Sequence, residues 1–150
     1  MKHVILAVNL FLAVAAGAQG DRTFIKSKLA AERHLPFSSA VLVGNTLYVA
    51  GTTADPDRLA AGLSFEQEAT DLMDQVKQNV EKAGMTMDDV VSVQVFCTDL
   101  SLYQTFNGAY RNYFHGNFPA RTFVGVAKLL FGARFEVNAI AVARTNNNKK

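Results

Sequence analysis

Cysteine, tryptophan and histidine are scarce in this sequence of 150 residues, which has one cysteine, no tryptophan and three histidines. A single cysteine, Cys97, excludes an intrachain disulfide and any metal site built from several thiolates. The histidines, His3, His34 and His115, do not have the spacing of metal ligands. We therefore expect no metal site, and we interpret Cys97 as a small buried hydrophobic residue rather than a nucleophile.

An excess of charge of one sign is also lacking. The formal net charge is +2, and the basic residues are scattered along the chain. A protein that binds a nucleic-acid backbone needs clustered lysine and arginine, and no such cluster with interleaved aromatic residues is present. The glycines at 84, 116 and 132 are isolated, so the sequence has no glycine-rich phosphate loop. Neither a nucleic-acid partner nor a cofactor is indicated.

The composition, with 49% hydrophobic and 19% charged residues, is sufficient for the core of one domain. The first residues differ from the rest. Lys2 and His3 precede an apolar run from Val4 to Ala18, which closes with small residues. This layout predicts a signal peptide over residues 1–18, with residues 19–150 as the mature domain.

Export to the periplasm or out of the cell would follow from such a peptide. The apolar run is shorter than the roughly 20 residues that a membrane-spanning helix needs, so no stable membrane anchor is expected. No cysteine stands at the expected cleavage site, which disfavours a lipid anchor. A buried N-terminal strand is the alternative, although the run is longer than most strands.

Hydrophobic periodicity divides the remaining chain into strands and helices. Ser64 and Gln67 form a capping box before a helix whose apolar residues share one face until Gly84, and a second helix is predicted from about 99 to 114. Strands are predicted at 23–28, 39–43, 46–50, 90–98, 121–127 and 133–143. This order predicts an α+β fold, in which a mixed β-sheet carries two helices on one face.

Two charged residues stand in apolar strands. Arg121 follows Pro119 and Ala120, and Glu136 lies fifteen positions later in the strand Phe135–Val142. Charged groups are rarely buried unless they are paired or functional. The pattern therefore leaves two alternatives open, a functional site or a structural ion pair across neighbouring strands.

Residues 34–142 also contain a series of short segments in a characteristic order. These are Leu35–Ser38, Val49–Gly51, Gln75–Asn79, Ala83-Gly84, Val90–Leu100, Phe106–Tyr110 up to Phe114, Phe118–Arg121 and the strand around Glu136. In these segments the chain resembles the reactive intermediate deaminase family, also called Rid, RidA-like or YjgF. The resemblance implies the chorismate-mutase-like fold of that family and a homotrimeric barrel with sites at the subunit interfaces. Strands that are apolar on both faces agree with a partner on the second face.

The activity implied by the resemblance is hydrolysis of reactive 2-imino acids or their enamines, such as 2-aminoacrylate or 2-iminobutanoate, to 2-keto acids and ammonia. Arg121 would hold the substrate carboxylate by two parallel hydrogen bonds, and Glu136 would hold and polarise the attacking water. Asn107 and Tyr110 on the second helix would support the pocket; helix packing and capping are the alternative for both, and the one we favour for Tyr110. The other implied substrate-binding positions are Phe37, Ala50, Gly51, Asn107 and Phe123.

The chain departs from the family pattern at four positions. Phe37 replaces a tyrosine, Ala50 a serine, Phe123 a small residue or cysteine, and Leu130 a proline. These changes remove hydroxyl groups and make the expected pocket drier and bulkier. We therefore expect a preference for apolar imino acids or a reduced activity.

Two other functions remain open beside an imine hydrolase. The lost hydroxyl groups favour a non-catalytic trimer that binds a small carboxylate ligand through Arg121, whereas the retained Glu136 disfavours it. Ribonuclease activity or inhibition of translation is an older description of the family. The expected export and the lack of a basic cluster argue against it.

Overall fold

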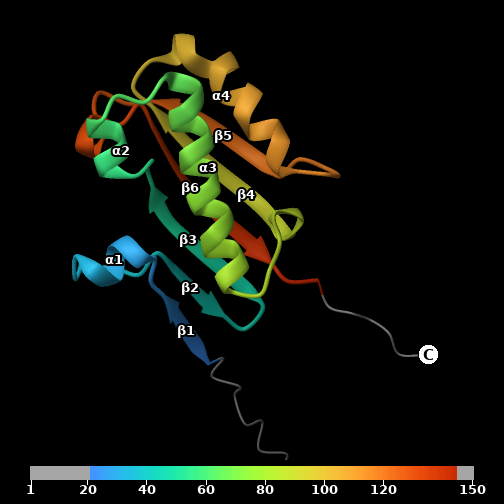
Figure 1. The fold of residues 1–150 in the computed structure, drawn as a ribbon. Coiled ribbons are helices and arrows are strands. Elements are labelled where there is room, and N and C mark those ends of the chain that lie inside the picture. The colour runs from blue at the N-terminus through green and yellow to red at the C-terminus, as the bar shows by residue number, and fades with distance from the viewer. Residues whose placement is uncertain (1–20, 145–150) are drawn as a thin grey trace, which may run out of the picture.

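The computed structural model describes residues 21–144, in which six strands form one sheet covered by helices (Figure 1). The strands are β1 (Arg22–Ile25), β2 (Ala40–Val43), β3 (Thr46–Thr52), β4 (Val90–Cys97), β5 (Ala120–Gly125) and β6 (Phe135–Val142). The α-helices are α1 (Lys28–Glu32), α2 (Pro56–Ala60), α3 (Phe65–Lys82) and α4 (Tyr103–Tyr110). The expected signal peptide lies outside the described residues.

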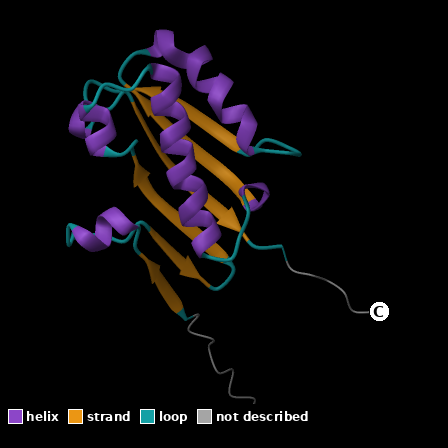
Figure 2. Cartoon of the chain, viewed as in Figure 1, coloured by secondary structure: helices purple, strands orange, loops and turns teal. Residues whose placement is uncertain are grey.

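The sheet has the order β1-β2-β3-β6-β4-β5. Only β4 and β5 pair in parallel, and the other neighbours are antiparallel, so the sheet is mixed. Helices α3 and α4 lie on the same face of the sheet, with α3 crossing its middle (Figure 2). The predicted α+β fold is confirmed.

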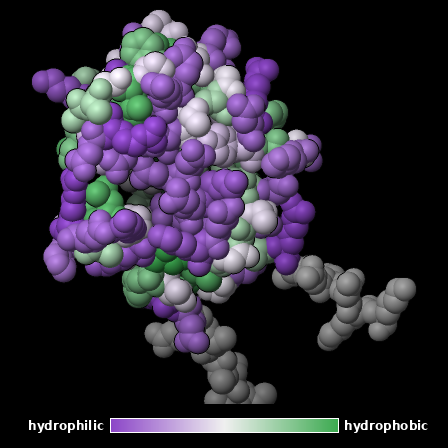
Figure 3. Space-filling view, viewed as in Figure 1, coloured by the Kyte–Doolittle hydropathy of each residue, from purple (hydrophilic) through white to green (hydrophobic). Residues whose placement is uncertain are grey.

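Helix α3 forms where the sequence predicts it. Ser64 accepts a hydrogen bond from the backbone of Gln67, whose side chain in turn accepts from the backbone of Ser64. Such a capping box satisfies backbone donors that the first helical turn leaves free. The helix ends before Gly84, which has a φ of 75° that side-chain-bearing residues rarely adopt. The side of α3 away from the sheet is hydrophilic (Figure 3).

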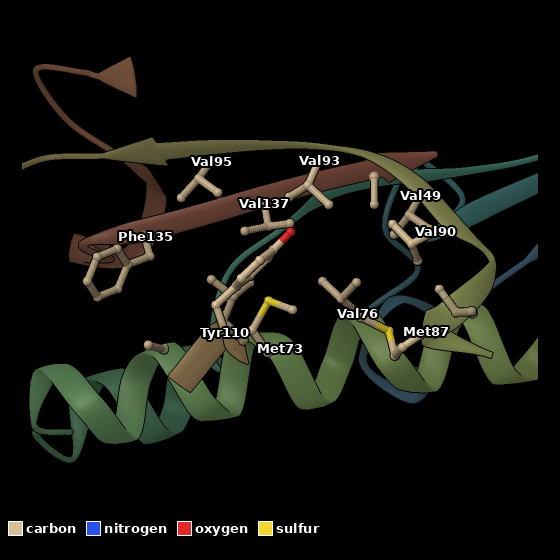
Figure 4. Close-up of a cluster of buried hydrophobic side chains, with 14 of the residues drawn as sticks. Val49, Met73, Val76, Met87, Val90, Val93, Val95, Tyr110, Phe135 and Val137 are labelled. Atoms are coloured by element: carbon tan, nitrogen blue, oxygen red, sulfur yellow. The ribbon is translucent and has the colours of Figure 1, made fainter. Parts of the chain in front are cut away.

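The core lies between this helix layer and the sheet. Alternate residues of β4 and β6 are buried, as expected for strands with one face in the core. Tyr110 of α4 inserts its ring among side chains of α3 and the strands, together with Met73, Val93, Val95 and Val137 (Figure 4). Cys97 is also fully buried, as predicted. Burial raises the pKa of its thiol.

The opposite face of the sheet carries apolar side chains that no helix covers. By the pleat alternation, Tyr48 of β3 and Ile140 of β6 point to this face, because both strand neighbours of each are buried in the core. Val124 of β5 points to it as well, because the preceding Phe123 packs against the core. Tyr48 and Val124 are 51% and 40% exposed. We call this the open face of the sheet.

Two short helices were not predicted. In one of them, Asp55 caps α2 and Pro56 is the first residue of the helix. Proline is favoured at this position because its fixed φ suits a helix and its missing N–H is not needed there. Helices α1 and α2 have five residues each, too few to show a periodic pattern.

A buried ion pair fastens α3 to the start of β6. Glu68 is fully buried, and its carboxylate accepts from the backbone N–H groups of Arg134 and Phe135 at 2.6 and 3.1 Å. The guanidinium of Arg134 pairs with the same carboxylate and donates to the carbonyl of Leu63 at 2.8 Å. The carboxylate is therefore satisfied despite its burial, as a buried charge requires.

Candidate functional site

Arg121 lies on the helix-covered face of the sheet, not on the open face. It is aligned with the buried Val93 of the neighbouring β4, so the two side chains share a face. Its Nη2 donates a hydrogen bond of 2.7 Å to Oδ1 of Asn107 on α4, and a longer one of 3.3 Å to the hydroxyl of Tyr103. The structure thus brings together Arg121 and Asn107, two of the residues that the sequence singles out.

Aromatic rings surround the guanidinium. Its central carbon is 4.6 Å from the ring centre of Tyr110 and 5.5 Å from that of Tyr103, and Phe106 and Phe123 lie at 6.0 and 5.8 Å. The faces of such rings attract a cation. Within residues 21–144, no carboxylate lies within 4.0 Å of this guanidinium. Its charge is therefore available to an anion.

A cleft of about 440 Å³ opens beside Arg121. It is lined by Tyr103, Asn107, Tyr110, Arg111, Phe118, Pro119 and Arg121. The cleft combines a fixed guanidinium, a second arginine at its rim and several apolar rings. Such a surface suits a small molecule with a carboxylate at one end and an apolar remainder.

Glu136 lies on the other side of the sheet. Its neighbours in β6, Phe135 and Val137, are buried in the core, so its own side chain points to the open face. There its carboxylate lies over Gly51 of β3: a Cβ built on Gly51 would overlap Oε1 of Glu136 and lie 3.1 Å from its Cδ. Gly51 leaves the space that this carboxylate occupies.

Arg121 and Glu136 are therefore not neighbours within one chain. Strand β4 lies between β5 and β6, and the two side chains point to opposite faces. Of the two alternatives that the sequence left open, the ion pair required neighbouring strands, but β6 inserts between β3 and β4 rather than beside β5. A structural ion pair between Arg121 and Glu136 within the chain is excluded for the same reason.

The remaining candidate residues divide between the two places. Phe123 is half-buried beside Arg121 and packs edge-to-face against Tyr103, with ring centres 5.0 Å apart. Ala50 is adjacent to Gly51, and its N–H donates to the carbonyl of Ser39 at 3.0 Å. Phe37 is exposed in the loop before β2, two residues from Ser39. Leu130, in the short turn before β6, is 69% exposed and lines neither place.

Sequence reasoning missed Tyr103 and Arg111 and underestimated Tyr110. Tyr103, Asn107 and Tyr110 are spaced by four and three residues, which places them on one side of a helix, and this spacing was available in the sequence. A hydrogen bond with Asn107, followed by the charge and the hydrogen bond of Arg121, lowers the pKa of Tyr103 from 10.0. Burial raises the pKa of Tyr110 to about 12.

No group of three or more histidine, cysteine, aspartate or glutamate residues in the described part of the chain is arranged to hold a metal ion. Among the helices of residues 21–144, none is both long and apolar enough to cross a bilayer.

Comparison with known proteins adds two relatives of similar length. The chain is 34% identical over 124 residues to 2-iminobutanoate/2-iminopropanoate deaminase of Dermatophagoides farinae. This alignment covers 81% of this chain and 96% of that protein. It is 32% identical over 123 residues to protein MMF1, mitochondrial, of Saccharomyces cerevisiae. This second alignment covers 81% of this chain and 85% of the yeast protein.

The prediction of export is wrong. The yeast relative is named as a mitochondrial protein, which places it inside the cell. The prediction depended on the apolar run of residues 4–18 alone, and these residues lie outside the part of the chain that the structure describes. A short apolar run next to a positive charge is only a compositional pattern, and such a pattern does not by itself determine the cellular location of a protein.

The fold is similar to that of a solved member of the YjgF/YER057c/UK114 family, Rv2704 from Mycobacterium tuberculosis. The TM-score is 0.72 and the sequence identity 27%, over 82% of this chain and the whole of the other. Residues 27–143 match the family model described as endoribonuclease L-PSP. The order of the segments around Arg121 and Glu136, the sheet topology and these matches lead to one conclusion: the chain belongs to the L-PSP family, also called YjgF or RidA.

Proposed function

We propose that the protein hydrolyses 2-imino acids, or the enamines in equilibrium with them, to 2-keto acids and ammonia. The observation that carries the proposal is the guanidinium of Arg121, which Asn107 fixes beside a cleft lined with aromatic rings and which has no acidic partner among residues 21–144. A 2-imino acid offers a carboxylate for this group. The relative from Dermatophagoides farinae, named a 2-iminobutanoate/2-iminopropanoate deaminase, supports the same reaction.

In this reaction, Arg121 binds the substrate carboxylate through its planar pair of N–H donors. Glu136 holds a water molecule and accepts a proton as the water attacks the imine carbon. The carbinolamine that forms then releases ammonia and leaves a 2-keto acid. No step requires a metal ion or an organic cofactor.

The separation of Arg121 and Glu136 within one chain means that a shared site needs two copies of the chain. The open face of the sheet supports such an assembly, because Tyr48 and Val124 expose apolar surface there. We propose a homotrimer in which the Arg121 cleft of one copy faces Gly51 and Glu136 of the next. Light scattering of the purified protein at micromolar concentration should give the mass of three chains. A single-chain mass would contradict both the assembly and the shared site.

The direct test of activity uses imino acids generated in the assay by an amino-acid oxidase, with semicarbazide present to capture what remains unhydrolysed. Wild-type protein should reduce the captured fraction and increase the rate of keto-acid formation. An apolar series from 2-iminopropanoate to longer side chains would test the preference suggested by Phe37, Ala50 and Phe123. If no imino acid of the series is hydrolysed faster than in buffer, the proposal is wrong.

A carboxylate-binding protein without catalysis is the second candidate. It is favoured by one observation, that the Arg121 cleft is formed within a single chain whereas Glu136 lies on the other face of the sheet. Calorimetry with 2-oxobutanoate separates the two candidates when it is combined with the assay above. Binding without hydrolysis by a trimeric protein would establish the second candidate.

A further inference from the structure

Tyr103 has a position that the proposed function does not yet explain. It is the first residue of α4, it is 40% exposed, and it lines the same cleft as Arg121. Its ring is held by Phe123, and its hydroxyl oxygen accepts a hydrogen bond from Nη2 of Arg121. The hydroxyl is thus fixed next to the group that would bind a carboxylate.

The hydrogen of this hydroxyl is free to point into the cleft. A phenol oxygen carries one hydrogen and two acceptor positions. Arg121 can only donate, so it occupies one acceptor position of the hydroxyl oxygen and leaves the hydroxyl hydrogen unused. Within residues 21–144 the hydroxyl of Tyr103 donates no hydrogen bond to another group, so its hydrogen can be given to a ligand in the cleft.

A 2-imino acid held by Arg121 would supply the acceptor. Its imine nitrogen is attached to the carbon next to the carboxylate, and the hydroxyl of Tyr103 lies 3.3 Å from the guanidinium that binds this carboxylate. The guanidinium would also stabilise a phenolate that forms when the proton leaves, because charge-assisted donors already lie in place. Among the implied site residues, Phe37 contributes no hydroxyl, and Tyr103 supplies one from α4.

We propose that Tyr103 is a catalytic residue that donates its proton to the imine nitrogen, an inference that rests on the proposed function. Water attacks the imine carbon and gives a proton to Glu136, while the electron pair of the C=N bond moves to the nitrogen, which takes the proton of Tyr103. The carbinolamine hydroxyl then returns a proton to the phenolate. As the C–N bond breaks, the nitrogen takes the proton from Glu136 and leaves as ammonia, so both residues are restored.

Tyr103→Phe tests this role, because it removes only the hydroxyl and keeps the ring that packs on Phe123. The turnover number should fall by about 100-fold, within the usual contribution of a positioned acid. The dissociation constant for 2-oxobutanoate should change by less than about threefold, since the lost bond contributes mainly to the transition state. Tyr113→Phe is the matched control: it removes a hydroxyl that hydrogen-bonds Asp74 at 2.7 Å in a different groove, and it should keep wild-type turnover.

The pH dependence of turnover is a second test, because it would not depend on the hydroxyl of Tyr103 if that residue were purely structural. Within one chain, the groups that face Tyr103 are Asn107 on its own helix, Arg121 of β5 and Arg111 after α4, and none of them is acidic. In the proposed trimer, Glu136 of the next copy also faces the cleft. Wild-type turnover should therefore decline on the alkaline side below pH 10.0, the ordinary pKa of tyrosine, as Tyr103 loses its proton. Tyr103→Phe should lack this decline.

Three results would overturn the proposal. If wild-type protein is active and Arg121→Ala is not, but Tyr103→Phe keeps full turnover, then Tyr103 is not the acid and the proposed function still stands. If Tyr103→Phe loses affinity for 2-oxobutanoate by the same factor as kcat/KM, Tyr103 is a binding residue only. If wild-type protein hydrolyses no imino acid, the proposed function and the role of Tyr103 are both wrong.

Discussion

The carboxylate of Glu136 lies over Gly51, so that a β-carbon at position 51 would overlap Oε1 of this glutamate. The two residues come from β6 and β3, which are neighbouring antiparallel strands. The pairing of these strands is irregular between Val49 and Thr52, which is where Gly51 lies. The missing side chain of Gly51 therefore determines where the carboxylate of Glu136 can be.

Gly51→Ala should displace Glu136 without unfolding the domain. The atoms that the new methyl group meets belong to the end of a flexible side chain, not to the backbone. We expect turnover of a 2-imino acid to fall by about 10- to 100-fold, because small displacements of a catalytic group are costly. The urea midpoint of unfolding should stay close to wild type. Gly108→Ala, where a Cβ meets nothing within 4 Å, is the control and should keep full activity.

Arg121→Lys should fail nearly as badly as Arg121→Ala in the imine assay. A lysine ammonium is a point charge and cannot reproduce the two parallel hydrogen bonds of a guanidinium, nor its stacking with the ring of Tyr110. The affinity for 2-oxobutanoate, measured by calorimetry, should fall in parallel. A lysine variant with wild-type kcat/KM would show that Arg121 supplies charge alone.

Glu136→Gln should separate binding from turnover. The amide keeps the size of the side chain over Gly51 but cannot accept a proton from water. We expect turnover to fall by roughly 100- to 10,000-fold, the usual contribution of a positioned base, whereas the calorimetric affinity for 2-oxobutanoate changes little. Retention of wild-type hydrolysis by a folded Glu136→Gln trimer would remove Glu136 from the mechanism.

Mixed assemblies test whether Arg121 and Glu136 of one site come from different chains. Arg121→Ala and Glu136→Gln trimers should each be inactive, but co-expression should restore activity, because about one of the three interfaces in a mixed trimer then carries both intact residues. Mixing two preparations of Arg121→Ala is the control. If co-expressed variants stay inactive although mass spectrometry detects mixed trimers, the two residues do not act across an interface.

Glu68→Gln should lower stability rather than catalysis. The substitution leaves Arg134 without its counter-charge beneath α3, and breaking a buried pair in this way costs about 3 kcal/mol. Urea unfolding followed by circular dichroism measures the loss. Glu81→Gln in the exposed pair with Lys77 is the matched control and should change the free energy of unfolding by less than about 1 kcal/mol. Equal effects of the two substitutions would contradict the role assigned to the buried pair.

The helices and strands that could be predicted from the sequence are those whose formation depends on residues close together in the chain. The capping box of Ser64 and Gln67 and the periodic apolar residues define α3 without reference to the rest of the chain. Alternation likewise gives the strands, to within two or three residues of their ends. Contacts between segments that are distant in the sequence leave no local pattern. The contact of Glu68 with Arg134, which are 66 positions apart, was therefore not predicted.

The arrangement of the candidate site residues could not be predicted from the sequence, and their roles stay predictions. Arg121 and Asn107 do meet, since both lie on elements that pack against each other. Arg121 and Glu136 do not, because the order of strands in the sheet differs from their order in the sequence. Tyr103 was overlooked because a tyrosine at the start of a helix is ordinarily a packing residue, and only the fold shows which arginine it faces.

The hydrogen bond between Arg121 and Asn107 also affects how tightly a ligand can bind. A mobile arginine loses up to about 2 kcal/mol of rotamer entropy when it is fixed. Here Asn107 and the surrounding rings immobilise the guanidinium during folding, before any ligand is present. The entropic cost is therefore part of the stability of the domain and would not be subtracted from the affinity for the carboxylate of the proposed substrate. Ligand affinity and the packing of α4 on β5 are thus linked quantities, and selection for one constrains the other.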